Sequence, residues 1–149
     1  MRARIIGWTI ATAFAAGVAA CADFEATVDP SGGLPDVVVP AATFSGQVLP
    51  IFEKRCSIGG CHSFASQQAG LVLTAEEAYD EIVNRPSTLR PQQLLVEPGD
   101  ADESWLVDMI GPDDSERHGR SRMPLASRPL TPNQIANIVN WINRGAPRD

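Results

Sequence analysis

Residues 56–62 read Cys-Ser-Ile-Gly-Gly-Cys-His, and this short stretch decides how the rest of the chain is interpreted. Two cysteines stand five positions apart, and a histidine directly follows the second. Two thiols and an imidazole in one loop can form a disulfide, ligate a metal ion or anchor a covalent cofactor. The remaining sequence has to distinguish these three chemistries.

The amino terminus indicates export. Two arginines within the first four residues precede an uncharged apolar run over residues 5–20, which is short for a membrane span and rich in small residues. The run ends in the letters VAAC at residues 18–21, which resemble the cleavage site of bacterial lipoproteins. We expect residues 1–20 to be a signal peptide and Cys21 to become the lipid-modified first residue. The alternative is an ordinary secretory signal that contains a cysteine.

Export bears on both charge and cysteine chemistry. Cleavage removes two arginines and no acid, and so takes the net formal charge from -6 to -8. A chain this acidic argues against nucleic acid as a partner. Cysteines in an oxidising compartment are expected to pair or to be modified, and if Cys21 takes lipid, Cys56 and Cys61 remain as a local pair.

The mature chain divides into a tether and one domain. Residues 21–43 contain three prolines and a Gly-Gly pair without helical periodicity, which predicts a flexible tether between the lipid and the domain. The domain is expected over residues 44–149. Two long irregular stretches within it, 57–73 and 112–130, are typical of loops that wrap around a bound cofactor.

Four helices and no strand are predicted in this domain, which makes it all-α. Each helix shows apolar residues at helical spacing. The expected boundaries follow from residues that cap or break helices. Pro50 interrupts a first helix at 44–55, and a capping box at Thr74–Glu77 opens the second. The third opens at Asp100 or Asp102 and ends at Gly111-Pro112, and the fourth is bounded by Thr131 and Gly145. Trp141 is expected to flank the apolar face of the fourth helix, which Ile135, Ile138, Val139 and Ile142 form.

The order of the cysteines and the histidine suits a c-type haem. Two thiols add to the vinyl groups of such a haem, and the adjacent imidazole binds its iron. Cys56, Cys61 and His62 supply these groups, with four residues instead of two between the thiols, and the paired glycines 59 and 60 let the extra residues bulge. A Cys56–Cys61 disulfide beside a solvated His62 is one alternative. Zinc is disfavoured because the chain has only two histidines and no second cysteine pair.

A haem that transfers electrons usually has a second axial ligand. Met123 precedes Pro124 in an irregular loop ahead of the last helix, and we expect it to bind the iron. Met109 falls in the apolar stripe of the third helix and is more simply a core residue. His118 lies in a polar loop, where a solvated surface histidine is the ordinary case. Both remain alternatives.

These segments, taken in order, resemble a class I monohaem c-type cytochrome domain of the exported bacterial subgroup with a widened haem motif. The resemblance covers about residues 44–147 and is carried by VLPIFEKRCSIGGCH, AGLVLTAEEAYDEIV, VEPGDADESWLVDMI, GRSRMP and LTPNQIANIVNWINRGA. It implies about four helices wrapped around one covalent haem c. It also implies thioethers at Cys56 and Cys61, with His62 as proximal and Met123 as distal ligand.

The same resemblance implies that the first and last helices cross near the haem edge, with Phe52 and Trp141 at the contact. It predicts an electron carrier rather than an enzyme, held by its lipid on the periplasmic side of a bacterial membrane. Redox proteins are then the expected partners, and a small-molecule substrate is not expected. Two other functions remain open: a haem accessory subunit that feeds a separate periplasmic oxidoreductase, and a non-haem surface binding module with a Cys56–Cys61 disulfide.

Four arginines and no acid occur between residues 117 and 128, namely Arg117, Arg120, Arg122 and Arg128. They are expected either to pair with haem propionates and solvent or to form a positive patch that steers an acidic redox partner.

Overall fold

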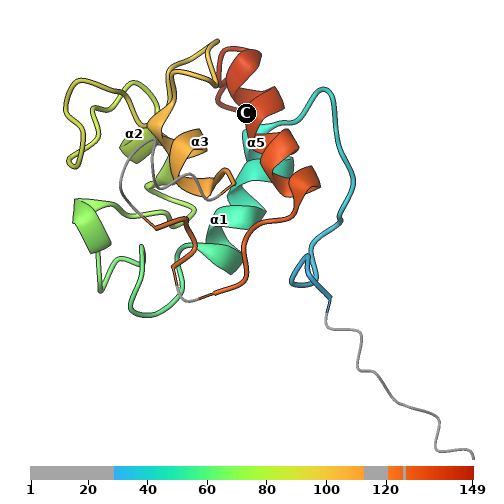
Figure 1. Ribbon diagram of the computed structural model, residues 1–149, viewed down its shortest axis with the longest axis horizontal. Coiled ribbons are helices and arrows are strands. Elements are labelled where there is room, and N and C mark those ends of the chain that lie inside the picture. The colour runs from blue at the N-terminus through green and yellow to red at the C-terminus, as the bar shows by residue number, and fades with distance from the viewer. Residues whose placement is uncertain (1–28, 113–120, 126) are drawn as a thin grey trace, which may run out of the picture.

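The computed structural model describes residues 29–112, 121–125 and 127–149 (Figure 1). Cys21, His118, Arg117 and Arg120 therefore lie outside the described residues. The helical elements are η1 (Phe44–Val48), α1 (Leu49–Arg55), η2 (Gln68–Gly70), α2 (Ala78–Ile82), α3 (Trp105–Ile110) and α5 (Pro132–Asn143). Over the described ranges no strand forms, and extended segments pair only at isolated bridges. This helical character agrees with the predicted all-α class.

The first helical segment changes type between Val48 and Leu49, just before Pro50. Its amino-terminal part, η1, is a π-helix, and its second part, α1, is an α-helix with the proline in the first turn. The change of hydrogen-bond register between η1 and α1 accommodates Pro50, which has no N–H to donate. The Thr43 hydroxyl caps η1 by accepting from the Gly46 N–H at 3.1 Å. The helical pattern thus begins at Phe44, and the predicted interruption appears as a change of helix type just before Pro50.

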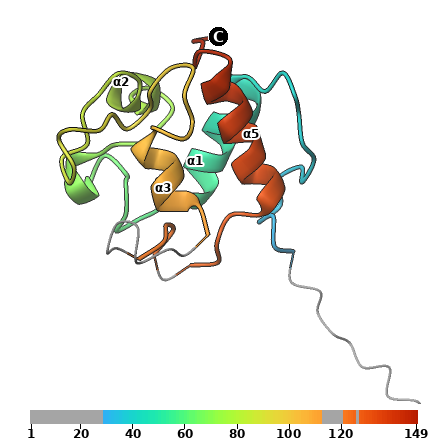
Figure 2. The same ribbon diagram turned by 45° about the horizontal axis from the view of Figure 1, so that its top comes forward.

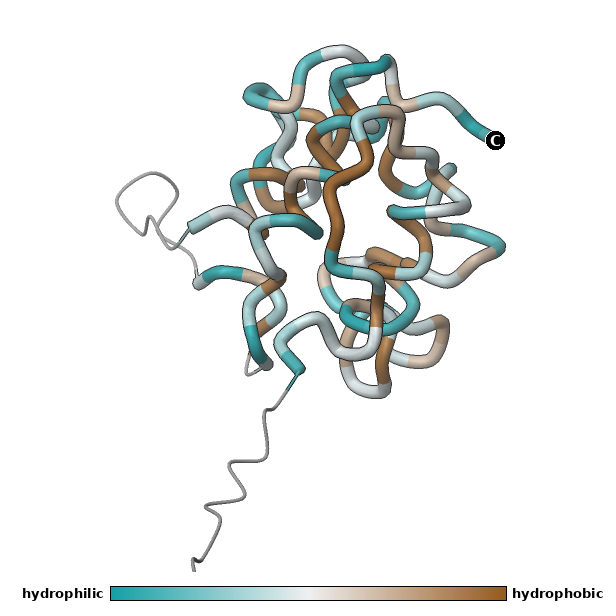
Figure 3. Tube along the Cα trace, turned by 90° about the vertical axis from the view of Figure 1, so that its right-hand side faces the viewer, coloured by the Kyte–Doolittle hydropathy of each residue, from teal (hydrophilic) through white to brown (hydrophobic). Residues whose placement is uncertain are grey.

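An aromatic cluster joins this segment to the last helix. Phe44 in η1 contacts Trp141 in α5 at a ring-centroid distance of 5.4 Å, and it meets Tyr79 in α2 at 5.3 Å. Phe52 reaches the cluster through Phe44, at 6.4 Å. Phe52 and Trp141, expected at the contact of the first and last helices, are both buried in the same core, where Phe44 contacts both rings. Hydrophobic segments run through the middle of the chain trace, and hydrophilic ones gather at the outer turns (Figure 3).

The second helix, α2, starts later than predicted. The expected capping box does not form; instead the Thr74 carbonyl accepts from the N–H groups of Glu77 and Ala78, at 3.2 and 2.9 Å. These bonds make a turn before the helix, which begins at Ala78. Local turn bonds therefore replace the side-chain cap that the sequence suggested.

The third helix, α3, also starts later than predicted, at Trp105. The Asp100 carboxylate accepts from the N–H groups of Asp102 and Glu103, both at 3.1 Å, and so caps the turn that precedes the helix. The predicted end is confirmed, because Gly111 is the C-terminal cap.

The last helix, α5, agrees best with its sequence signals. Thr131 and Gln134 form the predicted capping box, and Gly145 follows the helix with φ +93°. Its buried face is rotated from the predicted one, because Trp141 is fully buried while Ile135 and Val139 are only partly buried. The rotation also buries two polar side chains of α5, Gln134 and Asn137.

Residues 29–42, here called the strap, form a turn at their start and then an extended segment that lies along α5 (Figures 1 and 2). Three side chains of α5 and that of its C-terminal cap, Arg144, hold the strap backbone. Gln134 donates to the Ser31 carbonyl at 2.8 Å, Asn137 bonds Val37 and Val39, Asn140 donates to Val39 at 3.2 Å, and Arg144 donates to Ala42 at 2.7 Å. These strap residues were expected to belong to a flexible tether. In the structure the packed unit already includes them.

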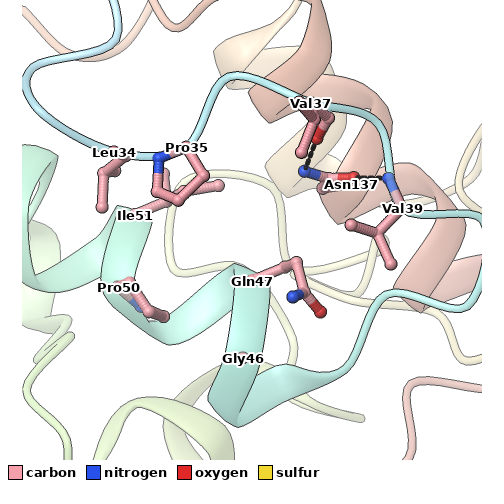
Figure 4. A pocket seen from close by; sticks show the side chains of 9 residues that line it. All are labelled: Leu34, Pro35, Val37, Val39, Gly46, Gln47, Pro50, Ile51 and Asn137. Carbon is pink, nitrogen blue, oxygen red and sulfur yellow. Dashed lines mark hydrogen bonds between the residues drawn. The ribbon is translucent and has the colours of Figure 1, made fainter.

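Between the strap and the first helical segment lies a small hollow of about 80 Å³ (Figure 4). Asn137 stands at its edge, donating to the Val37 carbonyl at 2.9 Å and accepting from the Val39 N–H at 2.7 Å.

Among the described residues, no helix is long and apolar enough to cross a bilayer.

Candidate haem-binding site

The loop of Cys56, Cys61 and His62 is closed by its own backbone. Cys56 is the C-terminal cap of α1, and its N–H donates to the Phe52 carbonyl at 2.8 Å. The His62 N–H then donates back to the Cys56 carbonyl at 3.1 Å. The chain therefore returns to the first cysteine immediately after the second, despite the four-residue spacer.

The spacer residues form an outward bulge. Ile58, Gly59 and Gly60 are exposed, and the Cys61 N–H donates to the Ile58 carbonyl at 3.0 Å. Gly60 has φ +83°, a conformation that residues with a Cβ rarely adopt. A Cβ at Gly59 or Gly60 would meet nothing within 4 Å. The predicted bulge is confirmed, but only Gly60 needs the freedom of glycine.

His62 has a fixed backbone and an unsatisfied side chain. Its N–H bonds Cys56, and its carbonyl accepts from the Leu73 N–H at 2.8 Å. Its Nδ1 is buried with no hydrogen-bond partner among the described residues. Leaving a buried polar atom unpaired costs about 1–3 kcal/mol, so such an atom calls for an explanation.

The two thiols are free and differ in environment. Cys56 packs against the hydrophobic core, and this burial raises the pKa of its thiol to about 12, while the neighbouring Arg55 charge opposes the rise. Cys61 is held through its carbonyl, which accepts from the Ser66 hydroxyl at 2.7 Å and from the Gln68 N–H at 3.1 Å.

Met123 lies in a loop docked on the end of α3. Its side chain packs against the core, and its N–H donates to the Met109 carbonyl at 2.7 Å. Met109 itself is a buried residue of α3, as a core role requires. Both ribbon views place residues 121–125 near the carboxyl-terminal end of α1 and the loop that follows it (Figures 1 and 2).

The Arg122 side chain bonds to backbone carbonyls at both ends of this loop. Its guanidinium donates to the Ile110 carbonyl at 2.9 Å and to the Leu130 carbonyl at 3.4 Å. These bonds hold the Arg122 side chain on the protein backbone, and the positive patch expected from the four arginines stays a prediction.

Sequence reasoning missed a buried cation beside the site. Arg55, the last residue of α1, is only 9% exposed and donates to backbone carbonyls of two distant segments. A basic residue in the last turn of a helix is ordinarily explained by the helix dipole, so its position alone gave no signal.

The residues present fit a covalent haem in their chemistry. Two free thiols precede an imidazole with an unpaired buried nitrogen, and a methionine sulfur is available from another segment; thioethers and His/Met ligation use this donor set. Within the described ranges, no three histidine, cysteine, aspartate or glutamate side chains are placed to hold a metal ion together. No protein-family model, curated protein or solved structure matches the chain.

Proposed function

We propose that this protein carries one covalently bound c-type haem and transfers electrons. The observation that carries the proposal is the bond from the His62 N–H to the Cys56 carbonyl, 3.1 Å long. It keeps histidine and first cysteine adjacent, which is what the shorter spacing of the ordinary haem motif achieves. The extra residues are accommodated by the bulge that ends at Gly60.

Each residue of the site has a distinct role in this proposal. Cys56 and Cys61 hold the haem through thioethers, and His62 binds the iron. The buried Nδ1 of His62 lacks a partner among the described residues, and iron bound at that atom would supply one and offset the cost of burying it. Met123 supplies the second axial ligand, which raises the reduction potential relative to a second histidine. When bound, the haem supplies one-electron redox chemistry, while the protein sets its potential and access.

The proposal also places the protein at a membrane. Export and lipidation at Cys21 put the carrier on the periplasmic side, where redox proteins are its partners and the lipid is its contact with the bilayer. A carrier and an accessory subunit of an oxidoreductase would use the same haem site. They differ in whether the protein copurifies with an enzyme.

The deciding experiment combines a spectrum with an intact mass. The full chain is produced with and without the haem-maturation machinery of a bacterial host. We expect a c-type absorption spectrum only with that machinery, and one haem that stays attached after denaturation. Haem that is fully extracted by acidified acetone would refute the thioethers. A haem-free chain lighter by two hydrogens would indicate the Cys56–Cys61 disulfide and the binding module instead.

A further inference from the structure

Arg55 connects two segments that are about a hundred residues apart in the sequence. Its Nη1 donates to the Pro30 carbonyl in the strap at 3.3 Å. Its Nη2 donates to the Arg128 carbonyl at 2.7 Å and lies 3.5 Å from that of Pro129. A buried guanidinium is costly unless its N–H groups are satisfied, so these carbonyls and the cation depend on one another.

The carbonyls at residues 128 and 129 belong to the loop that carries Met123. The Met123 N–H fixes the middle of this loop to α3, and Arg122 bonds its far end at Leu130. Arg55 adds the contact just before α5 begins. The position of the Met123 loop therefore depends on a residue that directly precedes Cys56.

The strap presents its carbonyl to Arg55 from a tight turn. Asp29 builds this turn by accepting from the Ser31 N–H at 2.8 Å, the Ser31 hydroxyl at 2.6 Å and the Gly33 N–H at 2.7 Å. Gly32 lies against the guanidinium: a Cβ at this position would stand 2.7 Å from Nη1 of Arg55. A side chain at this position would therefore require the guanidinium to shift.

We propose that Arg55 is a positioning residue that couples the strap to the Met123 loop, so that docking of the strap stabilises the axial methionine. This inference rests on the proposed function for the role of Met123 as ligand. The coupling itself is a property of the chain, and it can be measured with or without haem.

Two neighbouring glycines provide a matched pair of variants. Gly32 has φ +67° and Gly33 has φ +79°, so alanine is strained at both positions by a similar backbone effect. The Cβ at Gly32 would displace the guanidinium, whereas the Cβ at Gly33 would lie an ordinary 3.8 Å from Nζ of Lys54. Gly32→Ala therefore perturbs Arg55, and Gly33→Ala is its control.

The first readout is hydrogen exchange in the full chain. We expect the Met123 amide to exchange about tenfold faster in Gly32→Ala, as loss of one hydrogen bond from a charged group would produce, and to be unchanged in Gly33→Ala. Amides within α5 should be unaffected in both variants. Arg55→Gln should reproduce the Gly32→Ala result. Equal exchange at Met123 in the wild type and Gly32→Ala, or equal acceleration in both glycine variants, would overturn the coupling.

The second readout uses the haem-loaded protein. The sulfur-to-iron band of the oxidised form is followed as the pH is raised. Its loss should have a lower midpoint pH in Gly32→Ala than in Gly33→Ala, because a looser loop releases methionine more easily. An identical midpoint in the two variants would contradict the proposal. If the wild type lacks this band, Met123 ligation fails as part of the proposed function, while the exchange experiment still decides the coupling.

Discussion

The backbone N–H of Met123 donates to the carbonyl of Met109 across 2.7 Å, so the two methionines considered as axial ligands are tied to each other. Only one of them is placed in a loop. Met109 is a buried residue of α3, and to bind iron it would have to leave the packing of that helix.

This relationship makes the ligand assignment testable. Met123→Ala should abolish the weak near-infrared sulfur-to-iron band and lower the reduction potential, while haem stays attached. Met109→Leu conserves volume and should keep the band at a cost below about 1.5 kcal/mol in stability. A band that survives in Met123→Ala and vanishes in Met109→Leu would reverse the assignment.

The glycines of the bulge should differ in cost. Gly60→Ala places a Cβ on a residue with φ +83° and should lower the free energy of unfolding by about 1 kcal/mol. Gly59→Ala needs no such conformation and should be close to neutral; the surroundings of both positions are open. Denaturant unfolding measures the difference in stability between the two variants. The fraction of chains that carry haem, determined by mass spectrometry, should fall only in Gly60→Ala. Equal losses would mean that the bulge does not depend on Gly60.

The strap should contribute to global stability. Asn137→Ala removes two hydrogen bonds to Val37 and Val39 from a nearly buried site, and should cost about 1–3 kcal/mol in the free energy of unfolding. The control is Asn133→Ala, which removes one exposed bond to the Asp36 carbonyl and should cost less than about 1 kcal/mol. If both variants unfold at the same denaturant concentration as the wild type, the strap is not part of the cooperative unit.

Acid should weaken the start of η1 through Asp149. The Ser45 hydroxyl, at 2.5 Å, is the main cause that lowers the pKa of this carboxyl below 3.8, with the N–H groups of Ser45 and Phe44 assisting. Because the folded pKa is the lower one, the stabilisation is complete above the unfolded pKa and is lost as pH falls through the folded value. Asp149→Asn should therefore melt below the wild type at pH 7, and the gap should close as the pH falls below 3.8. A gap that stays constant with pH would rule out the carboxylate as its source.

What the sequence could predict was mostly local. The limits of α5 were predictable because Thr131, Gln134 and Gly145 act within one turn of the helix ends. The starts of α2 and α3 were not, since Thr74 and Asp100 bond to turns that compete with the helix. Thr74 and Thr131 both begin a capping-box pattern, and only the surrounding chain decided which of the two boxes formed.

The site was predictable to a similar extent. Cys56, Cys61 and His62 are close in sequence, and their loop could be inferred from the paired glycines. The docking of the strap could not be predicted, because side chains at α5 bind its backbone. Bonds to the backbone do not require a particular side-chain pattern in the strap sequence. Arg55 was missed for the same reason, since its hydrogen bonds to other described residues all go to backbone carbonyls.

The strap also changes how far the domain can travel from its anchor. A free chain over residues 22–43 would allow a reach of up to about 75 Å when fully extended. The strap is fastened from Asp29 onward, and the covalent length of the seven residues 22–28 limits the distance between Cys21 and the strap to about 25 Å. If Cys21 carries the lipid, as proposed, the folded domain stays close to the bilayer surface. It then meets its partners by lateral diffusion and does not cross the periplasm to reach them.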